Sequence, residues 1–128
     1  MTRPARTRSR ASAKAAGARF ERLVADHLAE RWDDRIDRKV STGARDTGDI
    51  ANFRTHDGRR ITVECKNERG TRLGPWWSEA TTERDNAGDD HALVVHKRHG
   101  EGYAGRQWVT LTLDELLHLL TDTTTEDK

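Results

Sequence analysis

A carboxylate and an ammonium group stand two residues apart in the apolar segment from Ile61 to Lys66. Alternate side chains of a β-strand point to opposite faces, so Glu64 and Lys66 share one face and Cys65 points to the other. On its own, such a pair is most simply an exposed ion pair without a chemical role. Its meaning therefore depends on which other polar side chains the fold brings beside it.

Asp49 is the residue that could complete a reactive group. The sequence His56-Asp57-Gly58 predicts a hairpin turn, and counting outward from it brings residue 50 opposite roughly residue 65. Asp49 then lies near Glu64 and Lys66. Two carboxylates at one place repel each other unless a cation joins them, and their oxygens are ligands that Mg²⁺ prefers, with water and a phosphate completing its shell. Lys66 could orient or activate the attacking water and offset charge on the phosphate.

A further acid, Glu21, stands in the first predicted helix. Apolar residues recur at helical spacing from Phe20 to Trp32, and Glu21 falls inside that apolar stripe. It could lie at the edge of the stripe and reach water or Arg45. Alternatively, it is an additional acid that faces the metal site and holds a second ion or its water shell.

These residues must be positioned by an α/β fold. Patterns of hydrophobicity and turn residues predict the order α-β-β-β-α-β-β-α and a mixed sheet with helices on its faces. Thr112 and Glu115 have the spacing of a capping box, which marks the start of the last helix. The predicted elements are a helix to about residue 32, strands at 36–41, 49–54 and 61–66, a helix from 75 to about 88, strands at 91–98 and 106–110, and a helix at 113–120.

The charge of the chain is unevenly distributed. The 128 residues carry a net charge of +1, but residues 1–19 hold six basic residues and no acid, and the other 109 hold 17 basic and 22 acidic residues. The basic start predicts a polyanionic partner. We expect a flexible basic arm at residues 1–11, one domain at 12–120 and a frayed tail at 121–128.

Other classes of protein are disfavoured by composition. No apolar run is long enough to cross a bilayer, which predicts a soluble, intracellular protein without membrane contact. The single cysteine cannot form an internal disulfide or a cysteine-based zinc site. His91, His96 and His99 share no ligand spacing and are expected to be structural or surface histidines.

Four short motifs together resemble the PD-(D/E)xK nuclease superfamily, whose members share the restriction-endonuclease-like fold. The resemblance extends from about Ala13 to Leu120 and is closest to the Holliday-junction resolvases of archaeal type and their bacteriophage relatives. The motifs are Gly17-x-x-Phe20-Glu21, Ser41-x-Gly43, Gly48-Asp49-Ile50 and Val63-Glu64-Cys65-Lys66.

The resemblance implies a role for each matching residue. Asp49 and Glu64 would be metal ligands for Mg²⁺, with Mn²⁺ as a substitute, and the backbone carbonyl of Cys65 would be a third ligand. Lys66 would be the catalytic lysine. The chain departs from the usual pattern because Gly48, and not proline, precedes Asp49.

Two further residues match features of the resolvases in particular. Glu21 corresponds to their helix acid and Ser41 to a serine that they place near the scissile phosphate. The implied function is a Mg²⁺-dependent structure-specific DNA endonuclease of recombination or repair, which acts as a homodimer on four-way junctions. The resemblance also implies that it acts in the cytoplasm of a bacterium or a phage-infected host. The alternatives are another repair or restriction-like nuclease of this fold and a non-catalytic DNA-binding protein.

DNA contacts are expected from basic side chains of the arm and of the loops that flank the site. Nothing in the sequence resembles a helix-turn-helix or a zinc finger, so recognition by shape and phosphate position is favoured over base readout. The expected DNA-binding residues are Arg3, Arg6, Arg8, Arg10, Lys14, Arg45, Arg69 and Arg72.

Overall fold

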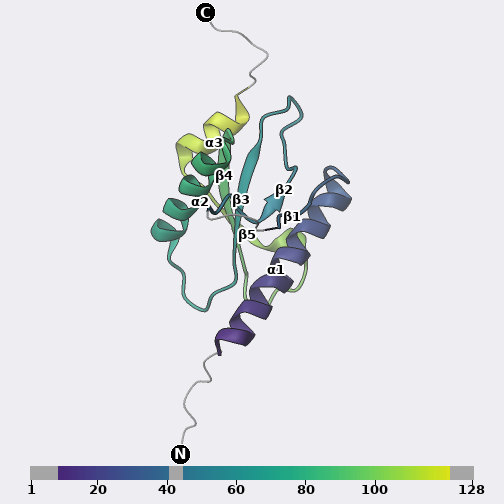
Figure 1. The fold of residues 1–128 in the computed structure, drawn as a ribbon, viewed down its shortest axis with the longest axis vertical. Coiled ribbons are helices and arrows are strands. Elements are labelled where there is room, and N and C mark those ends of the chain that lie inside the picture. Colours follow the sequence, from purple (N-terminus) through teal and green to yellow (C-terminus); the bar gives the residue numbers. More distant parts are fainter. Residues whose placement is uncertain (1–8, 41–44, 122–128) are drawn as a thin grey trace, which may run out of the picture.

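Helices cover both faces of a small mixed β-sheet in the computed structural model, which describes residues 9–40 and 45–121 (Figure 1). The predicted α/β class and the predicted order of helices and strands are confirmed. The elements are α1 (Arg10–Arg31), β1 (Asp37–Arg38), β2 (Ile50–Ala51), β3 (Ile61–Lys66), α2 (Leu73–Ala87), β4 (His91–His96), the 3₁₀ turn η1 (Ala104–Arg106), β5 (Trp108–Thr110) and α3 (Leu113–Leu120).

The first helix begins inside the stretch that the sequence assigned to a basic arm. The side-chain oxygen of Ser9 accepts a hydrogen bond from the backbone N–H of Ser12 at 3.1 Å, which caps the helix at its first turn. Arg10 is therefore the first helical residue. Toward its other end, α1 buries Phe20 and Val24 against the sheet, as the apolar spacing predicts.

The main sheet has the strand order β3-β4-β5. β3 and β4 are parallel and joined through α2, whereas β5 is antiparallel to β4. Alternation divides the core between the two faces: Val63 packs in the cluster with α1, and Val94 packs with Trp76 of α2. Since Glu64 and Lys66 alternate with Val63, they lie on the face that α2 covers.

The hairpin before β3 has a different register from the predicted one. The N–H of Ile61 donates to the carbonyl of Phe53, but the N–H of Asp49 donates to the carbonyl of Val63, both at 2.9 Å. The backbone of Asn52 lies between these pairs with φ at 67°, a left-handed conformation that interrupts regular pairing. As a result, β2 pairs with β1 in a separate two-stranded sheet.

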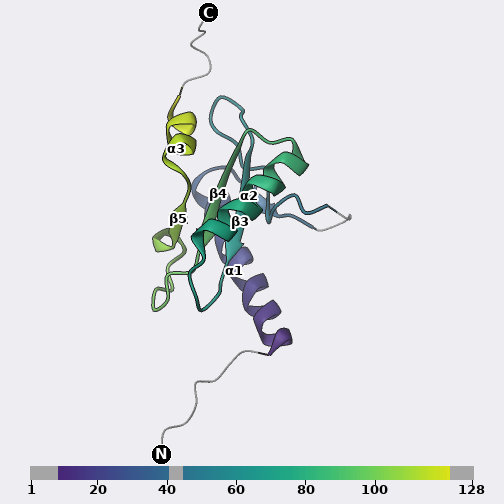
Figure 2. The same cartoon turned by 90° about the vertical axis from the view of Figure 1, so that its left-hand side faces the viewer.

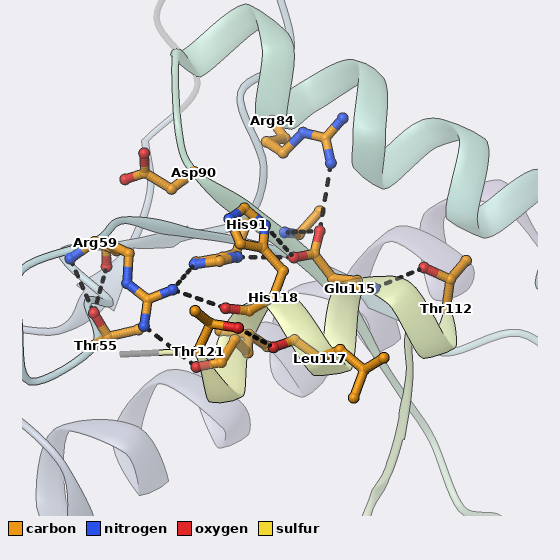
Figure 3. A network of polar contacts seen from close by, with 12 residues as sticks. Thr55, Arg59, Arg84, Asp90, His91, Thr112, Glu115, Leu117, His118 and Thr121 are labelled. Atoms are coloured by element: carbon orange, nitrogen blue, oxygen red, sulfur yellow. Dashed lines mark hydrogen bonds and ion pairs between the residues drawn. The ribbon is translucent and has the colours of Figure 1, made fainter. Parts of the chain in front are cut away.

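The start of α3 fulfils half of the predicted capping box. Thr112 accepts a hydrogen bond from the backbone N–H of Glu115 at 3.2 Å, as expected. The carboxylate of Glu115 turns inward instead of returning to Thr112, and it contacts Nδ1 of His91 at 2.8 Å and the N–H of Ala92 at 3.3 Å (Figure 3). This buried acid therefore attaches α3 to the beginning of β4.

No helix among residues 9–40 and 45–121 combines the length and the hydropathy that a membrane span requires.

Candidate active site

Asp49 is held against the open edge of β3 by its own backbone and side chain. Its N–H donates to the carbonyl of Val63, and its Oδ2 accepts from the N–H of Cys65 at 2.7 Å. The preceding Gly48 has φ at 97°, and a Cβ there would lie 2.9 Å from Cγ2 of Thr62. Only glycine allows this backbone conformation together with such close approach to β3. This accounts for the presence of glycine, instead of the usual proline, before Asp49.

Replacing Gly48 with alanine is expected to destabilise the fold and to displace Asp49. Both the positive φ and the clash with Thr62 oppose a Cβ, so we expect a loss of about 2–4 kcal/mol in the free energy of unfolding. Thermal denaturation followed by circular dichroism measures it. Gly58→Ala is the matched control, since φ is 91° there but nothing lies within 4 Å of the added Cβ. Equal losses for the two variants would contradict the close approach.

Glu64 and Lys66 lie side by side at the carboxyl end of β3. Glu64 is buried, and its Oε2 is 3.3 Å from the Nζ of Lys66. The same ammonium group is 2.8 Å from Oε1 of Glu79 on α2. Burial alone would lower the pKa of Lys66, but the hydrogen bonds with Glu79 and Glu64 outweigh it and raise the pKa. Lys66 therefore remains protonated and acts as a fixed positive charge.

Two acids that the sequence analysis missed come from α2. Glu64, Glu79 and Glu83 each offer an oxygen within 4.8 Å of the others. Glu83 is only 3% exposed, and its Oε1 has no hydrogen-bond partner among the described residues. The available signal was helical spacing, since Glu83 follows Trp76 and Ala80 on the buried face of α2.

The acids of this site are electrostatically suited to a cation; Glu64 and Glu83 are buried and Asp49 is partly buried. Burial, together with the charge of Glu64, raises the pKa of Asp49 to about 8. Burial is also the main reason that the pKa values of Glu64 and Glu83 rise to about 8. At neutral pH these groups must retain protons or share a positive ion. Their carboxylate oxygens are suitable ligands for a hard divalent ion such as Mg²⁺, and Oε1 of Glu83 has no hydrogen-bond partner among the described residues that would compete with such an ion.

Glu21 faces the same region from α1. Its negative charge contributes to the raised pKa of Asp49, after burial and Glu64. Its Oε1 accepts hydrogen bonds from Nε and Nη2 of Arg38, at 3.2 and 2.8 Å. The partner is thus Arg38 of β1, not Arg45, and Glu21 is 22% exposed. Its role as a second metal-binding acid stays a prediction.

Two of the segments that carry expected DNA-binding residues lie close to each other near this site. The N-terminal end of α1 and the loop after β3 lie at the same end in both views (Figures 1 and 2), and Asn67 contacts the carbonyl of Ala16 at 3.5 Å. Arg10, Lys14, Arg45, Arg69 and Arg72 are all exposed. Arg3, Arg6, Arg8 and Ser41 lie outside the described residues.

His91, Glu115 and His118 form a second group whose spacing could suit a metal. Figure 3 shows Arg59 against this group, with Nη1 at 2.9 Å from Nε2 of His91. Arginine has only donors, so Nε2 accepts and Nδ1 carries the proton toward Glu115. Both ring nitrogens of His91 already take part in hydrogen bonds, to Arg59 and to Glu115. We therefore interpret these three residues as structural and not as metal ligands.

An α/β fold with an aspartate at the edge of the strand that carries Glu-x-Lys is the arrangement typical of the PD-(D/E)xK superfamily. The family model described as phage putative PDDEXK endonuclease matches residues 12–125, and the chain belongs to that family. Comparisons with curated proteins and with solved structures gave no match. This family supports the resemblance to the PD-(D/E)xK superfamily and a nuclease function. It does not distinguish Holliday-junction resolvases from other nucleases of the superfamily.

Proposed function

We propose that this protein is a metal-dependent endonuclease that hydrolyses DNA phosphodiesters and that its substrate is a four-way junction. The observation that carries the proposal is the convergence of Asp49, Glu64 and Lys66 at one end of β3. The residues come from two segments, and α2 adds Glu83 beside them. Membership of the phage endonuclease family supports the same chemistry.

In this proposal the acids bind the metal ion, and the lysine stabilises the negative charge that develops on the phosphate. Asp49, Glu64, Glu83 and the Cys65 carbonyl would hold Mg²⁺ or Mn²⁺, which supplies positive charge that polarises the phosphate and acidifies water. The protonated Lys66, fixed by Glu64 and Glu79, offers its ammonium group to a phosphate oxygen on which negative charge develops.

The junction substrate rests on features beyond this common site. Glu21 on α1 and Ser41 are the two positions that resemble resolvases, and in the proposal Glu21 supports a second ion while Ser41 lies near the scissile phosphate. Symmetric cutting of a junction needs two active sites at a fixed separation, so a homodimer belongs to the proposal. Recombination or repair of DNA in the cytoplasm of a phage-infected cell is the corresponding role.

A comparison of DNA substrates tests the proposal. With Mg²⁺, the full chain is expected to cut four-way junctions at least about tenfold faster than flaps, nicked duplexes and linear duplexes of the same sequence, since recognition depends on shape. Product lengths on denaturing gels give the rates and the symmetry of the cuts. Equal cutting of linear duplex would reject the junction and favour a different nuclease of this fold.

A further inference from the structure

The molecule exposes a group of large apolar side chains on β5 and α3, which we call the β5–α3 edge. Each of the six side chains is 41–72% exposed. The four leucines lie within one short helix and so exceed the single, scattered apolar residues that soluble surfaces ordinarily carry. Trp108 and Val109 are consecutive in β5 and therefore lie on opposite faces of the sheet, one on each side of its outer strand. The residues of this edge are Trp108, Val109, Leu113, Leu116, Leu117 and Leu120.

The helix of this edge is apolar on the side that faces away from the molecule. Glu115 and Leu119 point inward, where Glu115 binds His91 and Leu119 packs on the core. The four exposed leucines follow i, i+3, i+4 and i+7 spacing and form a stripe on the opposite side. Figure 3 shows one of them, Leu117, directed away from His91. α3 therefore has one partnered and one unpartnered face within the described chain.

β5 and α3 lie along the same open side of the sheet (Figure 2). β5 pairs only with the second half of β4, from Val94 to His96, and forms the end of the strand order β3-β4-β5. α3 occupies the space beside the first half of β4, to which Glu115 binds. The backbone groups on the outer side of β5 thus form an open strand edge next to the leucine stripe.

We propose that a second copy of this chain covers the β5–α3 edge in a two-fold dimer. A two-fold axis brings identical patches together, so each leucine stripe meets another stripe and the two β5 strands can pair antiparallel. Counted over α3 and both faces of β5, the six residues expose on the order of 600 Å², and neighbouring backbone and rim atoms bring a dimer that covers them close to the ~800 Å² per partner of a standard interface.

Other occupants fit this edge less well. Residues 122–128 contain only threonine and charged side chains, so this part of the chain has no apolar group to place against the leucines. An apolar stripe also offers no contact to DNA phosphates. The edge lies across β4 from β3, and a dimer formed there leaves Asp49, Glu64 and Lys66 accessible. The inference deepens the proposed function, because it names the surface that would join two active sites.

The oligomeric state of the full chain without DNA tests this proposal. Wild-type protein is expected to sediment as a dimer at micromolar concentration, and Leu117→Glu and Leu113→Glu are each expected to weaken dimerisation by about a hundredfold or more. Both side chains are more than half exposed, so the variants should keep the wild-type circular dichroism spectrum. Leu73→Glu, at an exposed leucine of α2, is the matched control and should remain dimeric.

A cysteine placed on the stripe identifies the partner as a second copy. Oxidised Leu117→Cys is expected to form a disulfide-linked dimer, whereas wild type, whose single Cys65 is partly buried and lies outside the β5–α3 edge, should not. A monomeric wild type, an unaffected Leu117→Glu dimer or an absent crosslink would each overturn the proposal. Failure of the proposed cleavage would look different, since the protein would then be a dimer that cuts no DNA.

Discussion

Asp49→Asn is expected to abolish Mg²⁺-dependent cleavage, with a loss of at least about a thousandfold in rate, and to keep DNA binding at or above the wild-type level. Asparagine has nearly the same size as aspartate, and its side-chain oxygen can still accept the hydrogen bond from the N–H of Cys65. The variant loses the negative charge that would help to hold the cation. Without that charge, repulsion between the site and DNA phosphates also decreases.

Two measurements on the same protein separate this result from unfolding. Cleavage of labelled DNA gives the rate, and fluorescence anisotropy in Ca²⁺ or without metal gives the binding constant. Wild type should also gain thermal stability with Mg²⁺, by about 2.7 kcal/mol at a hundred times the dissociation constant, and Asp49→Asn should lose most of that gain. Asp26→Asn, at an exposed acid of α1, is the control and should cleave normally.

DNA binding without cleavage by the wild-type protein would assign it to a different functional class. If wild type binds DNA but does not cut it with Mg²⁺ or with Mn²⁺, Asp49→Asn has no activity to remove. The acids beside β3 would then be the remnant of a catalytic site, and the protein would be a DNA-binding member of a nuclease family. Cleavage by Asp49→Asn at the wild-type rate would instead place the reaction elsewhere in the molecule.

The strand that carries the site could be predicted from sequence because its pattern is local. Alternation from Ile61 to Lys66 predicts both the bounds of β3 and the face shared by Glu64 and Lys66, and the structure agrees. The bounds of α3 were also correct, since Thr112 provides a cap that acts within one turn. Short-range rules suffice where the determinant lies within a few residues.

The approach of Asp49 to β3 could be predicted only roughly. Counting from the turn assumes regular pairing, and the left-handed Asn52 breaks it, so that Asp49 aligns with Val63. A single asparagine gives no clear signal for such an irregularity, because asparagine adopts this conformation only in some contexts. The prediction was nevertheless close enough to place Asp49 beside Glu64 and Cys65.

The acids of α2 and the partner of Glu21 depend on contacts between distant segments. Glu83 belongs to a helix in which most residues are polar or charged, and its burial follows from the position of α2 on the sheet. Glu21 pairs with Arg38 because β1 runs beside α1, which the spacing of residues within either segment does not specify. Such pairings require tertiary structure, and they complete the site that the motif only outlines.

Lys66→Met is expected to lower the cleavage rate by about a hundred- to a thousandfold while leaving the stabilisation by Mg²⁺ nearly intact. Methionine replaces the apolar stem of lysine but lacks the ammonium group that lies between Glu64 and Glu79. The acids would still hold the cation, whereas the charge on the phosphate would lose a nearby positive group. Rates measured under saturating Mg²⁺, with thermal denaturation in parallel, distinguish the two effects.

Lys97→Met is the matched control for this experiment. Lys97 follows β4, its N–H donates to the carbonyl of Lys66 at 2.9 Å, and its own ammonium group contacts the carbonyl of Glu101 instead of the acids. It should therefore cleave at nearly the wild-type rate. If Lys66→Met loses the response to Mg²⁺ along with cleavage, Lys66 acts by keeping Glu64 and Glu79 in place. If it cleaves normally, its ammonium group contributes nothing to the transition state, and the Glu64–Lys66 pair is the ordinary ion pair that its spacing alone would suggest.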